Sequence, residues 1–118
     1  DKTKEAVAIL EGALGKMSKG TLFYSLLNTQ LGTAYMKDGN FEKAISSYQN
    51  VLDDKKFNYL HGDILIKMGI SYQQLNNVEK ARESYTKAST DFGETPAGKD
   101  AKTYLRLLEI SQNSAEGA

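Results

Sequence analysis

The sequence has 118 residues, and its 15 basic and 15 acidic side chains give a formal net charge of zero at pH 7. Nucleic-acid-binding proteins normally carry a basic excess, so this balance argues against that class. The lack of cysteine excludes disulfides and thiolate metal sites. The single proline and the many Ala, Leu, Lys and Glu residues favour one all-α domain. No apolar run is long enough for direct membrane insertion, and no signal peptide is visible.

The first predicted helix spans residues 2–17, where apolar residues recur at helical spacing and charges mostly occupy the other face. Ala6 and Leu10 lie 38 residues before Ala44 and Tyr48. The helix therefore resembles the second half of a helix-turn-helix unit. Two interpretations stay open: a half repeat whose first helix lies upstream, or a degenerate N-terminal cap. Because the sequence begins without Met, we expect it to be part of something longer.

After a polar break at residues 18–21, the second predicted helix runs to about residue 37, and a tight turn joins it to a third over about residues 41–52. Gly39 suits the left-handed conformation that ends a helix, and Asn40 can cap the following helix with its side-chain oxygen. The charged stretch 53–56 is predicted to be a solvated connector.

A fourth helix is predicted over about residues 59–75 and a fifth over about 78–91. Residues 76–77, both Asn, repeat the turn chemistry found earlier in the chain. A sixth helix is predicted to start at Pro96, with Thr95 as its cap.

Five positions of the second and third predicted helices recur 37 residues later. Leu31, Gly32, Tyr35, Ala44 and Tyr48 correspond to Met68, Gly69, Tyr72, Ala81 and Tyr85. Gly and Ala allow helices to approach closely, and tyrosine rings fill the remaining volume. A fixed offset across five positions indicates an internal repeat.

This pattern resembles the tetratricopeptide repeat, in which Leu-Gly-x-x-Tyr is followed by Ala-x-x-x-aromatic. Ala follows Tyr by nine positions in both copies, as the family requires. Asn28 and Leu65 stand where the family often has Trp, and the unit exceeds the usual length of about 34 residues. The resemblance implies an all-α, right-handed stack of antiparallel helix pairs, an α-solenoid with about six helices.

The resemblance also divides the chain. Residues 1–110 form one domain with a half repeat (1–17), two repeats (21–56 and 58–93) and a capping helix (95–110), before a frayed tail (111–118). In the capping helix, Arg106 and Glu109 fall on the Gly and Tyr positions of the repeat. No further helix needs to dock there, so we expect a polar outer face.

The sequence contains no constellation for catalysis or metal binding. His61 is the only histidine, and one His near Asp53 or Asp54 without cysteine makes a poor transition-metal site. A surface or helix-start histidine is the preferred interpretation. The carboxylates, Glu79 and Glu83 included, lie among Lys and Arg, which indicates solvated ion pairs. We therefore expect neither an enzyme nor a cofactor or metal.

The resemblance implies a concave groove, lined by the first helix of each repeat, that takes a peptide or partner helix. Helical phase places ten residues on this side: Leu26, Thr29, Thr33, Met36, Lys37, Asp63, Ile66, Lys67, Ile70 and Gln73. Ile66 and Ile70 would be exposed and would mark a protein contact, unless the C-terminal helix or tail covers them. The carboxylate clamp of chaperone-binding members is not reproduced at Thr29, Gln30, Thr33 and Ile66.

The predicted function is a non-catalytic scaffold with a protein or peptide partner. The alternative is an assembly domain, such as a homodimer, that pairs through the first helix along Ala6, Ile9, Leu10 and Ala13. Residues 90–105 resemble a linker of bacterial cell-envelope proteins of this family, with Gly93 in place of the first Pro. This favours the bacterial envelope or periplasm, with the cytoplasm as the alternative.

Overall fold

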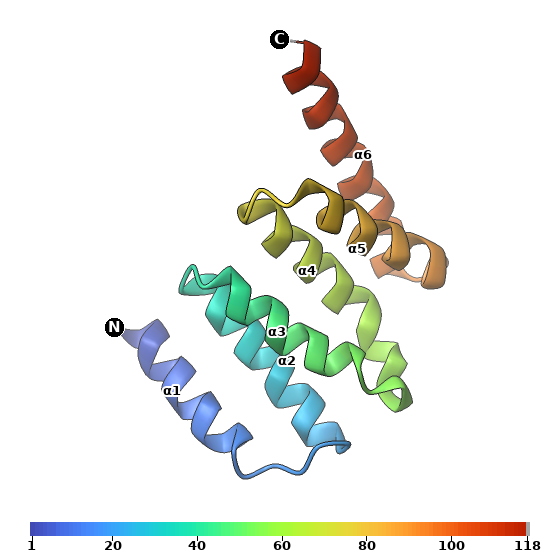
Figure 1. Cartoon of the computed structure of the whole chain (residues 1–118). Coiled ribbons are helices and arrows are strands. Elements are labelled where there is room, and N and C mark those ends of the chain that lie inside the picture. Colours follow the sequence, from blue (N-terminus) through green and yellow to red (C-terminus); the bar gives the residue numbers. More distant parts are fainter. Residues whose placement is uncertain (118) are drawn as a thin grey trace.

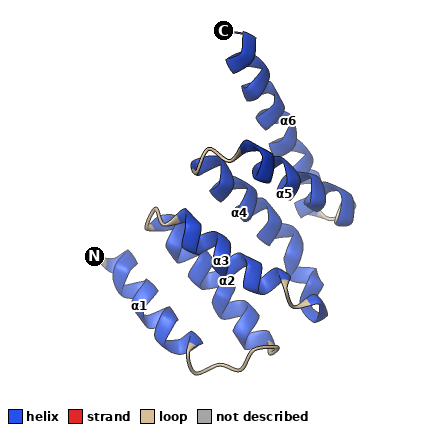
Figure 2. Cartoon of the chain, viewed as in Figure 1, coloured by secondary structure: helices blue, strands red, loops and turns tan. Residues whose placement is uncertain are grey.

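The computed structural model describes residues 1–117, which form helices and contain no β-strand (Figure 2). The elements are α1 (Lys2–Leu14), α2 (Leu22–Lys37), α3 (Phe41–Leu52), the 3-10 helix η1 (Lys55–Leu60), α4 (His61–Gln74), α5 (Val78–Asp91) and α6 (Pro96–Gly117). Each α-helix packs against the next in chain order, from α1 at one end of the stack to α6 at the other (Figure 1). The predicted all-α stack of six helices is confirmed.

The two tight turns within the helix pairs share one chemistry. Gly39 and Asn76 end α2 and α4 with φ angles of +76° and +60°. These are values that Gly and Asn tolerate better than other residues. Asn40 and Asn77 then cap α3 and α5, each side-chain oxygen accepting from the backbone N–H three residues on, at 3.3 Å and 3.2 Å. Both predicted turns are confirmed.

A first core cluster joins α2, α3 and α4. Its buried members are Leu31, Tyr35, Ala44, Tyr48, Val51, Ile64 and Met68. Tyr48 is fully buried, and its ring lies directly against the backbone of Gly32. A Cβ at Gly32 would be 2.5 Å from the Cε1 atom of Tyr48, so this contact requires glycine.

A second core cluster joins α4, α5 and α6 in the same way. Its buried members are Leu65, Ile66, Ala81, Tyr85, Ala88, Ala101 and Leu108. The ring of Tyr85 lies against Gly69 as that of Tyr48 does against Gly32. The repeat in the sequence is therefore a repeat of one packing unit, in which a tyrosine covers a glycine of the preceding helix.

The last helix is longer than predicted. α6 continues to Gly117, whereas we expected it to end at residue 110 with a frayed tail over 111–118; residue 118 lies outside the described residues. The stretch after 110 lacks apolar periodicity, but no residue before Gly117 breaks a helix, so α6 extends beyond α4 and α5 (Figure 1). On its expected polar outer face Arg106 is exposed and Glu109 is partly buried, whereas the exposed Leu107 lies on another side of the helix. Within residues 1–117 no helix has the length and apolar content to cross a bilayer.

Candidate interaction surface

His61, the one histidine, has a structural position at the start of α4. It is buried, and its Nε2 atom lies 3.1 Å from the carbonyl oxygen of Val51 and 3.2 Å from that of Asp54. Because both neighbours are acceptors, Nε2 carries the hydrogen and donates to them. The prediction that His61 lies at a helix start is therefore right, and the prediction that it lies on the surface is wrong. Across residues 1–117, no group of three His, Cys, Asp or Glu residues could hold a metal ion.

The acidic residues weighed in the sequence analysis serve caps, hydrogen bonds and ion pairs. The Oδ1 atom of Asp54 accepts from a backbone N–H of η1 at 3.2 Å, so residues 53–56 are not simply a solvated connector. Asp53 accepts from a neighbouring glutamine at 2.9 Å. Arg82 contacts Glu79 and Glu109 at 2.6 Å each, and these bonds, that to Glu109 foremost, raise its pKa. Arg82 thereby ties α5 to α6.

Three of the predicted groove residues satisfy the hydroxyl groups of the repeat tyrosines. The Oη atom of Tyr48 lies 3.0 Å from Oγ1 of Thr33 and donates to the sulfur of Met36 at 3.2 Å. The Oη atom of Tyr85 donates to the side-chain oxygen of Gln73. These side chains are partly buried, so they shape the wall of the predicted groove more than they offer free polar groups.

The structure corrects the assignment of Ile66. Its side chain is only 7% exposed and belongs to the second core cluster, together with Ala101 and Leu108 of α6. Ile70 is partly buried and packs against the same cluster. The alternative in which the C-terminal helix covers this face is therefore correct for Ile66. Helical phase showed which side of α4 the residue faces but not that α6 packs there.

The remaining predicted groove residues differ in accessibility. Leu26, Lys37 and Asp63 are exposed, whereas Thr29 and Lys67 are partly buried. The structure adds α6 to this side, since its register continues the 37-residue offset. That offset makes Tyr104 the counterpart of Lys67 and Leu107 the counterpart of Ile70, at 38% and 58% exposure. Applying the offset to these positions would have found both residues in the sequence.

Comparison with known families decides the nature of the fold. Two family models described as tetratricopeptide repeat match the chain, one over residues 26–58 and the other over 62–90. Between them they cover the α2–α3 and α4–α5 pairs. The chain belongs to the tetratricopeptide repeat family. A search of curated proteins found no match. Tetratricopeptide repeats generally mediate protein–protein interactions and are typically non-catalytic, so this chain is a protein-binding helical repeat.

A pocket between α1 and α2 of the tetratricopeptide stack is lined by residues of both predicted surfaces, the self-association face and the concave groove. It has a volume of about 290 Å³ and is lined by Ala6 and Leu10 of α1 and by Thr33 and Lys37 of α2, among others. The first two come from the predicted self-association face and the last two from the predicted groove. Of that self-association face only Ile9 is largely exposed, at 72%.

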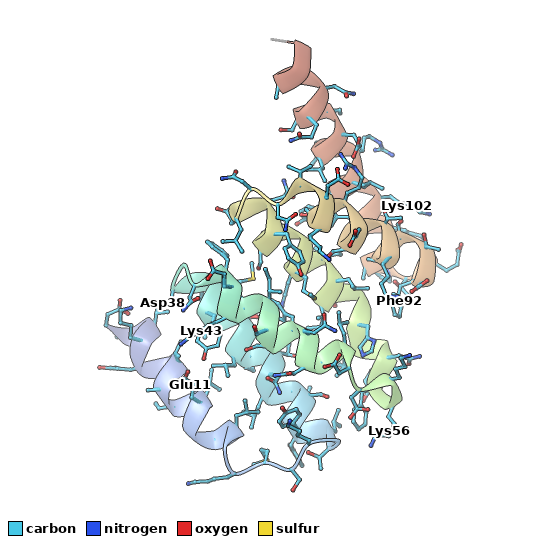
Figure 3. The ribbon with its side chains drawn as sticks, viewed as in Figure 1. Glu11, Asp38, Lys43, Lys56, Phe92 and Lys102 are labelled. Carbon is cyan, nitrogen blue, oxygen red and sulfur yellow. The ribbon has the colours of Figure 1, made fainter. Side chains whose placement is uncertain are left out.

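A second pocket, of about 350 Å³, lies between α1 and α3 on the tetratricopeptide stack. There Glu11 accepts the hydroxyl hydrogen of Tyr35, and the ammonium of Lys43 lies 5.7 Å from the centre of the same ring (Figure 3). Burial, and then Glu11, raise the pKa of Tyr35 to about 12. The sequence analysis missed this cluster, which binds α1 to the first full repeat.

Proposed function

We propose that this tetratricopeptide repeat domain is a non-catalytic scaffold that binds a peptide or partner helix along the concave side of α2, α4 and α6. The observation that carries the proposal is the exposure of Tyr104 and Leu107 at groove positions of α6, where Leu107 corresponds to the partly buried Ile70 of α4. Apolar side chains that gather on one exposed helical surface are typical of protein contacts.

Charged residues interrupt this apolar surface. Lys37 and Asp63 are exposed at groove positions of α2 and α4, and Leu26 adds a further apolar side chain on α2. A mixture of apolar anchors and separated charges of both signs suits a protein segment better than a nucleic acid, which requires a basic surface.

The non-catalytic part of the proposal is supported by the chemistry of the titratable residues. His61 donates to two backbone carbonyls, Asp54 caps η1, and Glu79 and Glu109 hold Arg82. General acid–base catalysis needs a group that is free to exchange a proton with a substrate. These groups instead stabilise the ends and the contacts of helices.

The test is affinity capture from a lysate of the source organism with the wild type, Leu107→Asp and Tyr59→Asp. Tyr59 is 67% exposed in η1, outside the groove, so its variant is a matched control for adding a charge to an exposed apolar site. We expect proteins that bind the wild type and the control but not Leu107→Asp. Identical proteins on all three baits would refute the concave site. Ile66 is not a suitable target, because a carboxylate there would disrupt the core.

The assembly alternative makes a different prediction. If the wild type associates with itself, its mass by light scattering rises with concentration, and Ile9→Asp should abolish the rise because Ile9 is the one largely exposed member of that face. We expect a constant monomer mass. A rise that depends on Ile9 would replace the scaffold proposal with an assembly function.

A further inference from the structure

A pocket between neighbouring repeats occurs twice in the stack. The pocket of about 350 Å³ is lined by α1, α2 and α3, and another, of about 420 Å³, is lined by α3, α4, α5 and the residues just after α3. We call these the first and the second inter-repeat pocket. Every residue that lines the first has its counterpart in the second, 38 residues later for α1 and 37 for α2 and α3. Three of these pairs are Glu11 and Gln49, Tyr35 and Tyr72, and Lys43 and Lys80.

The first inter-repeat pocket holds a carboxylate that comes from the chain itself. Glu11 of α1 accepts the hydroxyl hydrogen of Tyr35, and the ammonium of Lys43 lies 5.7 Å from the centre of the tyrosine ring (Figure 3). A hydrogen bond to an ionised acceptor is stronger than one between neutral groups. The first repeat therefore shows how a carboxylate fits a pocket of this kind.

The second inter-repeat pocket keeps the phenol but lacks the carboxylate. Gln49 stands in place of Glu11, and its side-chain nitrogen donates to Oδ1 of Asp53 at 2.9 Å. Within residues 1–115 no group hydrogen-bonds the hydroxyl of Tyr72. Its oxygen is not among the buried polar atoms that lack a partner, so it is open to solvent. The hydroxyl is available to a ligand that brings an acceptor.

The charges of the second pocket favour an anionic ligand. Three lysines, Lys55, Lys80 and Lys87, line it together with two acidic residues, Asp53 and Glu83, which leaves one positive charge. The one glutamate and the one lysine of the first pocket cancel. Lys80 is 55% exposed, and its ion pair with Glu83 is long, at 3.7 Å. Among the side chains of residues 1–115, Lys55 forms no ion pair.

We propose that the second inter-repeat pocket binds a glutamate side chain of a partner protein, whose carboxylate accepts the hydroxyl hydrogen of Tyr72 and lies beside the ammonium of Lys80. Leu52, Leu65 and Met68 give the pocket an apolar lining for the methylene groups of that side chain. The pocket shares no residue with the predicted concave groove. It rests on the proposed function only in taking a protein ligand.

The side chain of Gln49 is a poorer occupant of this place. To reach Tyr72 as Glu11 reaches Tyr35, it would have to leave its hydrogen bond with Asp53. Its amide oxygen is neutral, so it is a weaker acceptor than a carboxylate and gains nothing from the surplus of lysines. A carboxylate that arrives from outside therefore has the advantage over Gln49.

The probe is the blocked tripeptide acetyl-Ala-Glu-Ala-amide, whose one charge is the glutamate carboxylate. The peptide acetyl-Ala-Gln-Ala-amide is its neutral control. Binding to the whole, isotope-labelled chain is followed by two-dimensional NMR. We expect the glutamate peptide to shift the amide signals around Tyr72 and Lys80 with a dissociation constant of about 1–10 mM, since it makes few contacts. The glutamine peptide should cause no saturable shift.

Three substitutions test the position of the carboxylate. Tyr72→Phe removes the hydroxyl but keeps the ring, and Lys80→Gln removes the charge. Each should weaken binding of the glutamate peptide at least about threefold. Gln49→Glu should supply the carboxylate from within the chain, as Glu11 does, and abolish the shifts. Lys43→Gln is the matched control, because it makes the same change as Lys80→Gln in the first pocket, and it should leave binding unchanged.

Several results would overturn the proposal. These are the absence of a saturable shift, equal shifts from the two peptides, and binding that Tyr72→Phe and Gln49→Glu leave unchanged. Tighter binding of propionate than of the glutamate peptide would assign the pocket to a free carboxylate, against our proposal. Loss of the shifts in Leu107→Asp instead of Gln49→Glu would place the peptide in the concave groove. Each of these failures leaves the proposed function standing, because that function is tested through Leu107→Asp in the capture experiment.

Discussion

Replacing Gly32 by alanine tests the packing unit on which the fold depends. The added Cβ would lie 2.5 Å from Cε1 and 2.8 Å from both Cδ1 and Cζ of Tyr48. The ring cannot withdraw easily, because Tyr48 is fully buried and its hydroxyl lies 3.0 Å from that of Thr33. Either the ring or the whole of α2 must move.

Two opposing terms determine the magnitude. Alanine raises helix propensity over glycine by about 1 kcal/mol. Overpacking a close-packed core costs about 1–3 kcal/mol, and displacing the tyrosine hydroxyl from its partners costs about 1 kcal/mol more. We therefore expect Gly32→Ala to lower the free energy of unfolding by about 1–3 kcal/mol, and the melting temperature by about 5 °C or more.

The assay is urea unfolding followed by circular dichroism, with Gly12→Ala as the matched control. Gly12 also lies within a helix, but a Cβ there meets no atom within 4 Å. The control should therefore gain up to about 1 kcal/mol of stability from helix propensity alone. Adding Tyr48→Leu to Gly32→Ala should recover part of the loss by removing the clash. Equal stabilisation by both alanine variants would refute the argument that the ring requires glycine.

Three further predictions concern single side chains. Burial raises the pKa of Tyr85 to about 12. The folded state therefore favours the neutral phenol, and stability that is complete below about pH 10 should fall towards pH 12 by up to 1.4 kcal/mol per unit. Urea midpoints at pH 9, 10 and 11 measure this fall, which Tyr85→Phe should reduce. His61→Ala should cost about 1–3 kcal/mol in urea unfolding, because the packing of a buried imidazole is lost together with its hydrogen bonds to the carbonyls of Val51 and Asp54; an unchanged midpoint would contradict this structural role. Arg82→Gln should speed hydrogen exchange in α6 more than in α2, because the contact with Glu109 is lost. Uniform exchange across both helices would contradict this local role.

The fold could be predicted because its determinants lie close together and repeat. The Gly32–Tyr48 contact connects two adjacent helices, and the same chemistry recurs 37 residues later. The turns are encoded just as locally: Gly39 and Asn76 adopt positive φ in the one residue where each helix must end. Local signals of this kind need no knowledge of the rest of the chain.

The groove was harder to predict because accessibility depends on elements far along the chain. The phase of α4 correctly turns Ile66 and Ile70 to one side, but α6 covers Ile66 and leaves Ile70 at its edge. The 37-residue offset also applies to α6, but the sequence prediction applied it there only to the Gly and Tyr packing positions of the repeat. The same offset applied to the groove positions gives Tyr104 and Leu107. The envelope localisation has no structural counterpart and stays a prediction.

One position of the repeat shows why burial must be known before a packing signal can be told from a binding signal. Ser47 and Ser84 occupy a position that a neighbouring helix buries in each full repeat, and a small side chain suits that close contact. Ile9 occupies the same position in α1, where it is exposed. A single exposed apolar side chain is common on protein surfaces, so the exposure of Ile9 does not by itself show a binding site. The exchange of Ser for Ile becomes evidence of a contact only through light scattering of the wild type beside Ile9→Asp, in which loss of a concentration-dependent rise in mass would assign Ile9 to an interface.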